Sequence, residues 1–492
     1  MSARAELGTL EASGLIAIAA LQPELEYLFR HALVQEAAYG SLLKQDRRTL
    51  HRAAAETILS LHPDRHRELA AVIAMHFEQA GDSARAAEHL VAAGGHALER
   101  FANKEAASFF ARAFGLVNDD HVDLKLRAAI GGASAGWTYN ETGTDIERLE
   151  HALRAADRAD PRLVVEANFW VAFLRRQRGE MPESSPELKA ALERASQIGA
   201  ALGDTSAGAL PKAFMGSYLA FTGHLREGAL EMREALDSIE ADADPVSGAM
   251  VADFLAMTYA RLGDFKAAED TLARSRRLAK QGDEISRVDV MIAASAIHLE
   301  RGELDEASAQ SMECATQSEE LGAFACVVAS TVLYGAASLA KEDAEAAKGQ
   351  LDRGNELCVV TNMAPMRTLI HGLLGSARAQ LGDLQGGEAG WDQALAGARA
   401  MNDRFGEAQT LWGRARSNAR QASPDWAAAL VDLDRAVELF EAMETQPSLA
   451  RALHDRAEVL RALGRIGEAG DAEQRSADLA RRLGLKDLPR SD

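Results

Sequence analysis

The chain has 492 residues, of which 47% are hydrophobic, and its formal net charge is −20. This length predicts several globular domains or one long repetitive array, and the hydrophobic content suffices for a continuous core. The acidic balance argues against a nucleic-acid-binding surface, because neutralising phosphates needs clustered Lys and Arg. We therefore expect an acidic, soluble scaffold with no nucleic-acid partner.

Cysteine usage and hydropathy bear on the compartment. Cys314, Cys326 and Cys358 form no CxxC pair, which predicts neither a disulfide framework nor a zinc site and suits a reducing cytosol. The apolar run GLIAIAAL (14–21) is shorter than the roughly 20 apolar residues that a membrane span needs, and it lacks the cationic start of a signal peptide. We expect a cytoplasmic protein with no membrane contact.

The first elements in chain order occupy residues 10–59. This stretch predicts the end of a helix, then a short hairpin with strands near 15–19 and 27–29. Two helices follow, beginning near Arg30 and Asp46.

Residues 250–283 show the pattern that dominates the rest of the chain. An apolar stripe at helical spacing comprises Val251, Leu255, Tyr259 and Leu262. Gly263 then ends the helix, because glycine takes the left-handed closing conformation without strain. Asp264 follows and can cap the next helix. The pattern predicts a helix hairpin.

Equivalent turns recur every 39–42 residues, at Gly223, Gly263, Gly302, Lys341, Gly382, Ala422 and Gly464. Five residues after each turn the side chain is small: Gly228, Ala268, Ala307, Ala346, Gly387, Ala427 and Ala469. A helix pair that crosses closely needs a small residue at the contact. Weaker turns at Gly81, Gly143 and Gly179 extend the array towards the N-terminus.

Proline placement supports these boundaries. The pairs Asp160–Pro161 and Ser423–Pro424 each predict a cap residue followed by proline in the first helical turn. We expect no proline inside a helix, where it would cost about 3 kcal/mol.

The repeat itself resembles a known type. The Gly-Asp turn, with Tyr259 four residues before it and Ala268 five after, resembles the tetratricopeptide repeat. The period is longer than the usual 34 of that family and overlaps the HEAT range of about 40–47. The turn residues favour lengthened tetratricopeptide-like repeats. We therefore expect an all-α fold, a right-handed superhelical solenoid of helix hairpins with a period of about 40, over residues 67–492.

The N-terminal part carries a second resemblance. Four stretches, YLFRHALVQEAAYGSLL (27–43), RRTLHRAAAETI (47–58), 69–97 and 105–116, resemble the winged-helix segment of bacterial STAND-type signalling ATPases that lie between a class III adenylate cyclase, or another output domain, and a helical-repeat sensor. The resemblance covers roughly residues 10–116 and implies a partial winged-helix-like segment at 1–66. It also implies that the chain is the sensor and scaffold arm of such a system, with an ATPase or cyclase as a partner.

The ATPase activity of that family is not expected here. Its phosphate-binding loop ends in Lys-Ser or Lys-Thr after glycine, and this chain contains no Gly-Lys dipeptide. We expect a non-catalytic chain without cofactor or metal, corresponding to the C-terminal third of such a protein.

His31 is the candidate nucleotide-sensing residue. By the resemblance, it matches a histidine that reaches the β-phosphate of bound ADP, which would require an ATPase partner in trans. The alternative is that His31 packs between Phe29 and Gln35 and caps helix ends. A catalytic trio of His31, Gln35 and Glu36 is disfavoured, because adjacent helical positions do not share a face. We interpret the stretch first as a packing motif.

Other motifs favour structural roles. Ser134, in GASAG, fits the nucleophile-elbow pattern, but its flanks predict a helix and a turn rather than the required strand and helix. Ser41 and Lys44 fit S-x-x-K without the accompanying motifs of that enzyme class. The pair His62 and His66 predicts a turn around Pro63 rather than a metal-binding helix.

The array leaves its binding surface undetermined. His76 is expected to be buried and hydrogen-bonded, on the face towards the next hairpin. Carboxylates in 304–320 fall on an outward helix face, where solvation explains them, and a basic partner in the groove is the alternative. Aromatic residues are densest at Phe169, Trp170, Phe173, Phe214, Tyr218 and Phe221, where they either fill the core or line the concave surface.

Three functions follow as hypotheses. The first is a scaffold that holds a protein partner in its concave groove. The second is a small-ligand sensor that controls a cyclase or transcriptional output supplied by another chain or region. The third is an enzyme that uses Ser134 or His31, which the motifs disfavour.

Overall fold

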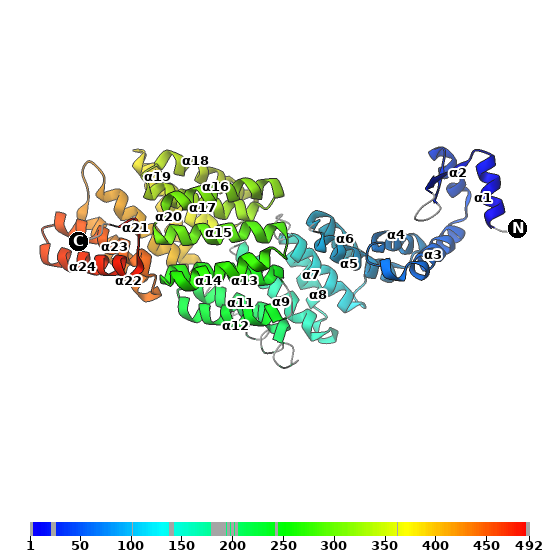
Figure 1. Cartoon of the computed structure of the whole chain (residues 1–492), viewed down its shortest axis with the longest axis horizontal. Coiled ribbons are helices and arrows are strands. Elements are labelled where there is room, and N and C mark those ends of the chain that lie inside the picture. The colour runs from blue at the N-terminus through cyan, green and yellow to red at the C-terminus, as the bar shows by residue number, and fades with distance from the viewer. Residues whose placement is uncertain are drawn as a thin grey trace.

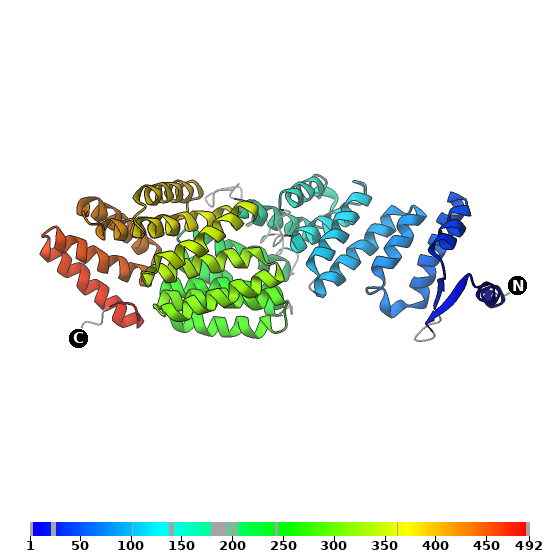
Figure 2. The same cartoon turned by 90° about the horizontal axis from the view of Figure 1, so that it is seen from above.

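The structure is a computed structural model. It describes residues 3–20, 26–100, 102–136, 142–178, 205–241, 245–361 and 363–488, with positions 193, 197 and 201. These residues form 23 α-helices, two short 3-10 helices and one two-stranded sheet. None of the described helices has the length and hydropathy to span a membrane. Figures 1 and 2 show an elongated molecule with the two termini at opposite ends.

The N-terminal elements match the predicted order. They are α1 (Ala3–Ala12), β1 (Ile16–Ala20), β2 (Glu26–Phe29), α2 (Ala32–Ser41) and α3 (Lys44–Leu61). The two strands pair antiparallel, with Ile16 opposite Phe29. The predicted hairpin and the helices expected near residues 30 and 46 are therefore confirmed.

The next group of helices continues along the molecule. It comprises η1 (Pro63–Arg65), α4 (Ala70–Ala80), α5 (Ser83–Glu99), α6 (Asn103–Leu116), α7 (Val122–Gly136), α8 (Thr142–Leu153), η2 (Ala156–Arg158) and α9 (Pro161–Gln177). Gly81 takes the left-handed conformation (φ 76°) between α4 and α5, and Ala86 after it is fully buried. The turn predicted at Gly143 is wrong, because this glycine lies inside α8. Gly179 lies outside the described residues.

The described residues beyond 205 form seven hairpins, one for each predicted turn. Their helices are α11 (Thr205–Phe221), α12 (Leu225–Ala241), α13 (Pro245–Leu262), α14 (Phe265–Ala279), α15 (Glu284–Arg301), α16 (Leu304–Leu321), α17 (Phe324–Ala340), α18 (Ala344–Thr361), α19 (Ala364–Gln380), α20 (Leu384–Met401), α21 (Arg404–Ala419), α22 (Trp426–Met443), α23 (Gln446–Ala462) and α24 (Ile466–Leu483). The all-α hairpin solenoid is confirmed.

Two predicted turns fall at shifted positions. In the α17–α18 hairpin the left-handed residue is Glu342 (φ 64°), one position after Lys341, and the fully buried small residue is correspondingly Ala347 rather than Ala346. The α21–α22 turn is longer than predicted, so the buried small residue is Ala429 and Ala427 is exposed. The position of the buried small residue in each hairpin thus depends on the geometry of its turn and not on a constant spacing from the predicted turn residue.

Prolines also depart from prediction in two places. The side chain of Asp160 caps α9 as expected by accepting a hydrogen bond from the Arg162 backbone N–H. Pro424, however, precedes the helix, since Asp425 is the cap of α22. Pro211 lies inside α11, contrary to expectation. Ala209 and Ala213, on either side of this proline, are buried in the main core, and tertiary packing of this kind overrides intrinsic helix propensity.

The small residues that follow each turn allow close helix crossing, as expected. A Cβ atom on Gly228 of α12 would lie 2.4 Å from the Gly216 carbonyl oxygen of α11 and 2.8 Å from the Ala220 backbone nitrogen. Backbone atoms cannot move aside as a flexible side chain can. The two helices therefore cross in backbone contact that a larger residue at 228 would prevent.

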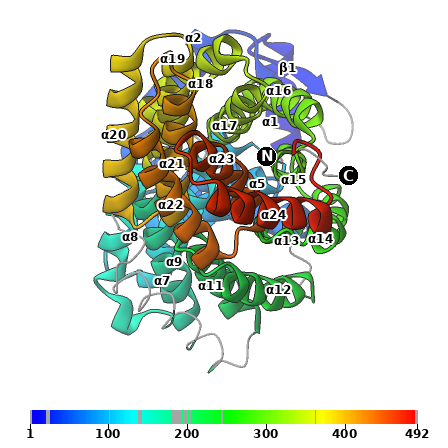
Figure 3. The same ribbon diagram turned by 90° about the vertical axis from the view of Figure 1, so that its left-hand side faces the viewer.

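The seven hairpins close into one turn. In Figure 3, which looks along the molecule from its C-terminal end, α11 to α22 lie around a ring and α24 lies beside α13 and α15. Residues far apart in sequence meet there: Arg226 Nε lies 2.6 Å from Glu444 Oε2, and the Lys486 N–H donates to the Arg301 carbonyl. We call α11–α24 the closed turn.

Glycines of the first two hairpins lie close to the last helices of this closed turn. A Cβ atom on Gly223 would lie 2.9 Å from Met443 Cγ, and one on Gly263 would lie 2.8 Å from Leu483 Cδ2. The equivalent Gly464 meets nothing within 4 Å. The early glycines therefore serve both the hairpin turn and the contact with the last helices.

Candidate functional site

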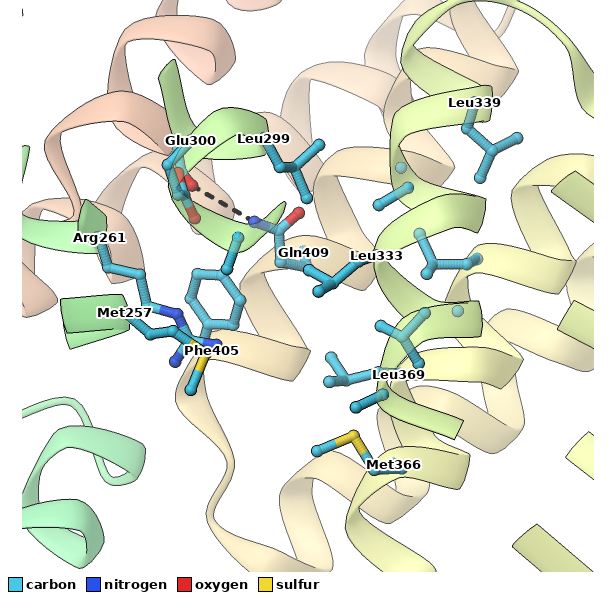
Figure 4. Close-up of a pocket in the computed structure, with 18 of the residues that line it drawn as sticks. Met257, Arg261, Leu299, Glu300, Leu333, Leu339, Met366, Leu369, Phe405 and Gln409 are labelled. Carbon is cyan, nitrogen blue, oxygen red and sulfur yellow. Dashed lines mark hydrogen bonds between the residues drawn. The ribbon is translucent and has the colours of Figure 1, made fainter. Parts of the chain in front are cut away.

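The closed turn surrounds a chamber of about 620 Å³. The first helix of each of its seven hairpins contributes to the lining, together with α9. Because these helices alternate with outer ones, the inward-facing side chains come from residues about 40 apart in sequence. Figure 4 shows part of this chamber.

One wall of the chamber is apolar. It is formed by α17 and α19 and includes Leu333, Leu339, Met366 and Leu369. In Figure 4 these side chains lie together on one side of the cavity. Such a surface favours contact with aliphatic or aromatic groups, since it can remove apolar area from water.

The opposite wall, on α13, α15, α21 and α23, combines polar residues with apolar ones such as Met257 and Phe405. Figure 4 places Arg261, Glu300 and Gln409 on this side. The Gln409 Nε2 donates to the Ser448 Oγ at 3.3 Å. Burial raises the pKa of Glu300, while the nearby guanidinium groups of Arg451 and Arg261 oppose that shift.

Arg451 links the last hairpin of the closed turn to the third hairpin. From α23 its guanidinium lies 2.6 Å from Asp487 Oδ2 and donates to the backbone carbonyls of Leu299 and Glu300 at 3.3 and 2.9 Å. Its side chain is only 11% exposed. A buried arginine with this many acceptors is committed to structure, so it holds α23 against α15.

A pair of carboxyl groups lies elsewhere in the lining. Asp253 of α13 is 4% exposed, and neither of its carboxylate oxygens has a hydrogen-bond partner among the described residues. Burial and the nearby charge of Asp289 raise the pKa of Asp253 well above its usual range, against smaller opposing effects of the Ser275 hydroxyl group and Arg276. Burial also raises the pKa of Asp289 to about 6, and the Cys326 thiol donates to its Oδ1 at 3.1 Å.

The aromatic group both fills the core and lines the chamber. Phe169, Phe173, Phe214 and Tyr218 are buried in one cluster between α7–α9 and α11. Phe173 and Phe221 also reach the chamber lining. The Arg176 guanidinium lies over the Phe221 ring at 4.8 Å, which places a cation at this end. Some of these aromatic residues therefore fill the core, as Phe169 does, and others line the concave surface, as Phe221 does.

His31 lies far from the chamber, in the N-terminal segment. It is exposed, it occupies the position before α2, and its side chain makes no capping hydrogen bond. The expectation that His31 caps a helix end is therefore wrong. Gln35 and Glu36 are likewise exposed on α2, a helix without a buried residue. The packing interpretation of this stretch is wrong for α2 itself.

The remaining sequence motifs are structural. Ser134 lies within α7, so the strand before the serine that a nucleophile elbow needs is missing at this position. Ser41 Oγ donates to the Ala38 carbonyl, and Lys44 begins α3. His66 Nε2 donates to the Leu59 carbonyl at 2.7 Å beside a 3-10 turn. Among the described residues no cluster of His, Cys, Asp and Glu is arranged to hold a metal ion.

His76 is hydrogen-bonded as expected, but it is half-buried rather than buried, and its partner lies on the preceding helix. Its Nδ1 lies 2.9 Å from His51 Nδ1 on α3, and His51 Nε2 lies 2.9 Å from the Tyr39 hydroxyl on α2. Burial, then the proximity of His51, lowers the pKa of His76. These three side chains connect α2, α3 and α4.

The chamber residues carried little signal in the sequence. Asp253 stands between apolar residues on the inward stripe that also holds Met257 and Arg261. A charge on an otherwise apolar face is the one mark that could have identified it. The sequence does not show which face of α13 lines the chamber, because that depends on how the closed turn closes.

Comparison with known proteins shows the fold alone. No family model and no curated protein sequence matches the chain. A Rap protein complexed with Competence and Sporulation Factor matches in structure with a TM-score of 0.54 and 12% identity, over 75% of this chain and 99% of that chain. Cut9-Hcn1 of the APC/C matches with 0.49 and 14%, over 92% of both. The Rap regulator of plasmid pLS20 with the Phr* peptide matches with 0.49 and 10%, over 73% and 97%.

The chain therefore has a tetratricopeptide-like helical-repeat fold. The link to signalling ATPases and cyclases stays a prediction.

Proposed function

We propose that the chain is a non-catalytic regulatory protein whose closed turn binds a peptide or small ligand in its chamber. The observation that carries this proposal is the chamber itself, with an apolar wall on α17 and α19 facing a wall of mixed polar and apolar residues on α13, α15, α21 and α23. Sites of this composition hold ligands by burying apolar groups and orienting polar ones. The similar Rap structure contains a bound Competence and Sporulation Factor, which supports a ligand-binding role for this fold.

A chamber-filling substitution tests this function. Ala336 of α17 lines the chamber, so Ala336→Trp should fill it. The control is Ala309→Trp on the exposed outer face of α16. Each purified protein is incubated with a fraction of small molecules and peptides from bacterial cells and examined by native mass spectrometry. Wild type and the Ala309→Trp control should both carry a ligand that Ala336→Trp lacks. Equal binding by all three would contradict the proposal.

We further propose that residues 10–61 dock on a signalling ATPase or cyclase partner, as the resemblance of this segment implies. Its apolar side chains are unusually open: Leu28 is 64% exposed, Leu33 78% and Leu43 71%. Large apolar residues grouped in this way mark interaction surfaces. In the bound state His31 would lie at the interface with the nucleotide domain.

Co-purification with an ATPase or cyclase encoded beside this gene tests the second proposal. Leu33→Asp should abolish the complex, whereas Val431→Asp, at a 68% exposed position on α22, should leave it intact. His31→Ala should preserve the complex and remove its preference for ADP. Robust ATP hydrolysis by the purified chain would contradict the non-catalytic assignment.

A further inference from the structure

The inference starts from the unpaired carboxyl group of Asp253. This side chain is more than nine-tenths buried, lines the chamber and has no hydrogen-bond partner for either oxygen among the described residues. A buried carboxyl group without partners is costly, whether it is charged or neutral. Asp289 on the adjacent α15 lines the same part of the chamber and raises that cost through repulsion. The site is therefore built to receive a positive charge.

The expected cation is organic rather than a metal. Asp289 already accepts a hydrogen bond from the Cys326 thiol, whose pKa burial raises well above its usual value, so this thiol stays protonated. No described cluster of carboxylate, thiol and imidazole groups has the arrangement that a metal needs. Apolar residues of the lining, Met250, Ile292 and Ala329, complete the surroundings. An ammonium group on an aliphatic chain fits both the charge and this environment.

An arginine with no ion pair in the described part of the chain lies on the same helix as the Asp253 carboxyl group. Arg261 follows Asp253 by eight residues on α13, and Met257 midway between them also lines the chamber. The Arg261 guanidinium lies 4.1 Å from the centre of the Phe405 ring and has no ion pair or hydrogen bond among the described residues. It is therefore available to an anionic group of a ligand.

Two acidic groups, Glu300 and Asp403, attract Arg261 electrostatically from the surrounding helices. Glu300 lies 3.7 Å from Arg451, and Asp403 Oδ1 caps α21 by accepting from the Gly406 N–H at 2.8 Å, while Asp403 Oδ2 has no hydrogen-bond partner among the described residues. Neither one forms a hydrogen bond with Arg261 in the structure. The Arg261 guanidinium thus packs on the Phe405 ring without a hydrogen-bond partner among the described residues, and the Asp253 carboxyl group likewise has none.

The separation of the two charges defines a ligand length. Eight residues of α-helix rise about 12 Å along the axis. An extended peptide rises about 3.4 Å per residue, so its two ends would span this distance with about four residues. We propose that the chamber recognises a zwitterionic ligand, a short peptide whose ammonium group binds Asp253 and Asp289 and whose carboxylate binds Arg261. Its apolar side chains would contact Leu333 and Leu369 on the opposite wall. This inference rests on the proposed ligand-binding function.

The experiment uses peptide pools whose only charges are at their ends. Random tetrapeptides without Lys, Arg, His, Asp or Glu are prepared with free ends, N-acetylated, C-amidated or blocked at both ends. Retention by the full chain is measured by affinity selection and mass spectrometry. An N-acetylated pool with one lysine asks whether a side-chain ammonium can replace the N-terminus. The variants are Asp253→Asn, Arg261→Gln, the chamber-filling Ala336→Trp and the surface control Asp305→Asn, at an 89% exposed side chain.

The expected result is a separate loss of each preference. Wild type should favour free over acetylated N-termini by about tenfold or more, as burial of paired charges implies. Asp253→Asn should reduce that preference to about twofold while keeping the preference for free C-termini. Arg261→Gln should do the reverse, and Asp305→Asn should match wild type. Asp253→Asn should also melt at a higher temperature than wild type, which shows that it folds.

Three outcomes would overturn the inference. They are retention of no pool by wild type, equal retention of free and blocked pools, or unchanged preferences in Asp253→Asn and Arg261→Gln. If blocked peptides bind equally but Ala336→Trp abolishes their binding, only recognition of the ends is refuted and the chamber remains a binding site. If Ala336→Trp retains the peptides as wild type does, the proposed function fails as well.

Discussion

The two ends of the molecule use amphipathic helices in opposite ways. In α23, within the closed turn, Leu449, Leu453 and Leu460 are 5%, 1% and 0% exposed. In α2, within the N-terminal segment, no residue is buried and Leu33 is 78% exposed. Helix hairpins bury their apolar faces only against neighbours, so the closed turn is complete within the chain and α2 is not. The comparison separates helix faces buried within the closed turn from a helix that the rest of the described chain leaves exposed.

The largest expected difference between these regions concerns core truncation. Phe440→Ala should destabilise the closed turn by about 4 kcal/mol, because Phe440 is fully buried and its removal leaves a cavity. Leu33→Ala should change stability by less than about 0.5 kcal/mol, since its side chain is already in water. Urea unfolding followed by circular dichroism measures both. Equal effects would mean that α2 is covered in solution.

Removing Arg451, which links α23 to α15, should destabilise the closed turn nearly as much. Arg451→Ala leaves Asp487 unpaired, with a side chain only 15% exposed, and should cost about 3 kcal/mol. The turn should also open, so the radius of gyration from small-angle X-ray scattering should rise. Arg456→Ala is the control: its partner Asp434 is 49% exposed, and its loss should cost less than about 1 kcal/mol. An unchanged scattering profile for Arg451→Ala would contradict the closing role.

Mild acid should affect the two regions in opposite directions. The pKa of Asp289 rises from 3.8 to about 6 on folding, so below pH 6 the folded state binds a proton first and the closed turn gains about 1 kcal/mol by pH 5. The pKa of His76 falls on folding, so the unfolded state binds the proton first and the α3–α4 hairpin loses stability below about pH 6.5. Hydrogen exchange at pH 7.5 and pH 5, corrected for intrinsic rates, measures both changes.

Substitutions identify the groups responsible for this response. Asp289→Asn should remove the gain in α15, and His76→Gln should reduce the loss in α3 and α4. A parallel response of both regions in wild type would show that other groups dominate.

The smallest expected effect lies at the contact between α2 and α3. Tyr39→Phe removes the hydroxyl group that lies 2.9 Å from His51 Nε2 and should cost about 0.5 kcal/mol at this exposed site. Exchange of the α2 amides should accelerate about twofold. In a His51→Phe background the Tyr39 substitution should have no further effect, if the two side chains act through one another.

Local structure was predictable wherever one or two residues decide it. Gly263 and Asp264 mark a turn and a cap because the left-handed backbone and the capping side chain are local requirements, and Asp264 accepts from the Ala267 N–H as expected. The turn at Lys341 was displaced by one residue because Glu342 takes the left-handed conformation without glycine. Pro211 and Gly143 were misjudged because helix packing overrides their intrinsic preferences.

The candidate site was much less predictable. Its lining combines side chains from seven hairpins and α9, and no periodic pattern states how far each hairpin rotates relative to the next. The aromatic residues near 169–221 illustrate this, since Phe169 is in the core while Phe221 reaches the chamber. Asp253 looked like one of many carboxylates in an acidic chain.

By itself, the sequence determined that this protein is a solenoid of helix hairpins, because stripe spacing, turn glycines and small contact residues act over a few neighbouring positions. The tertiary structure alone decided that the solenoid closes on itself, that Arg451 holds the closure, and that Asp253 and Arg261 face the same chamber. Those features depend on small rotations between hairpins that accumulate over more than 200 residues, as the contact of Arg226 with Glu444 shows.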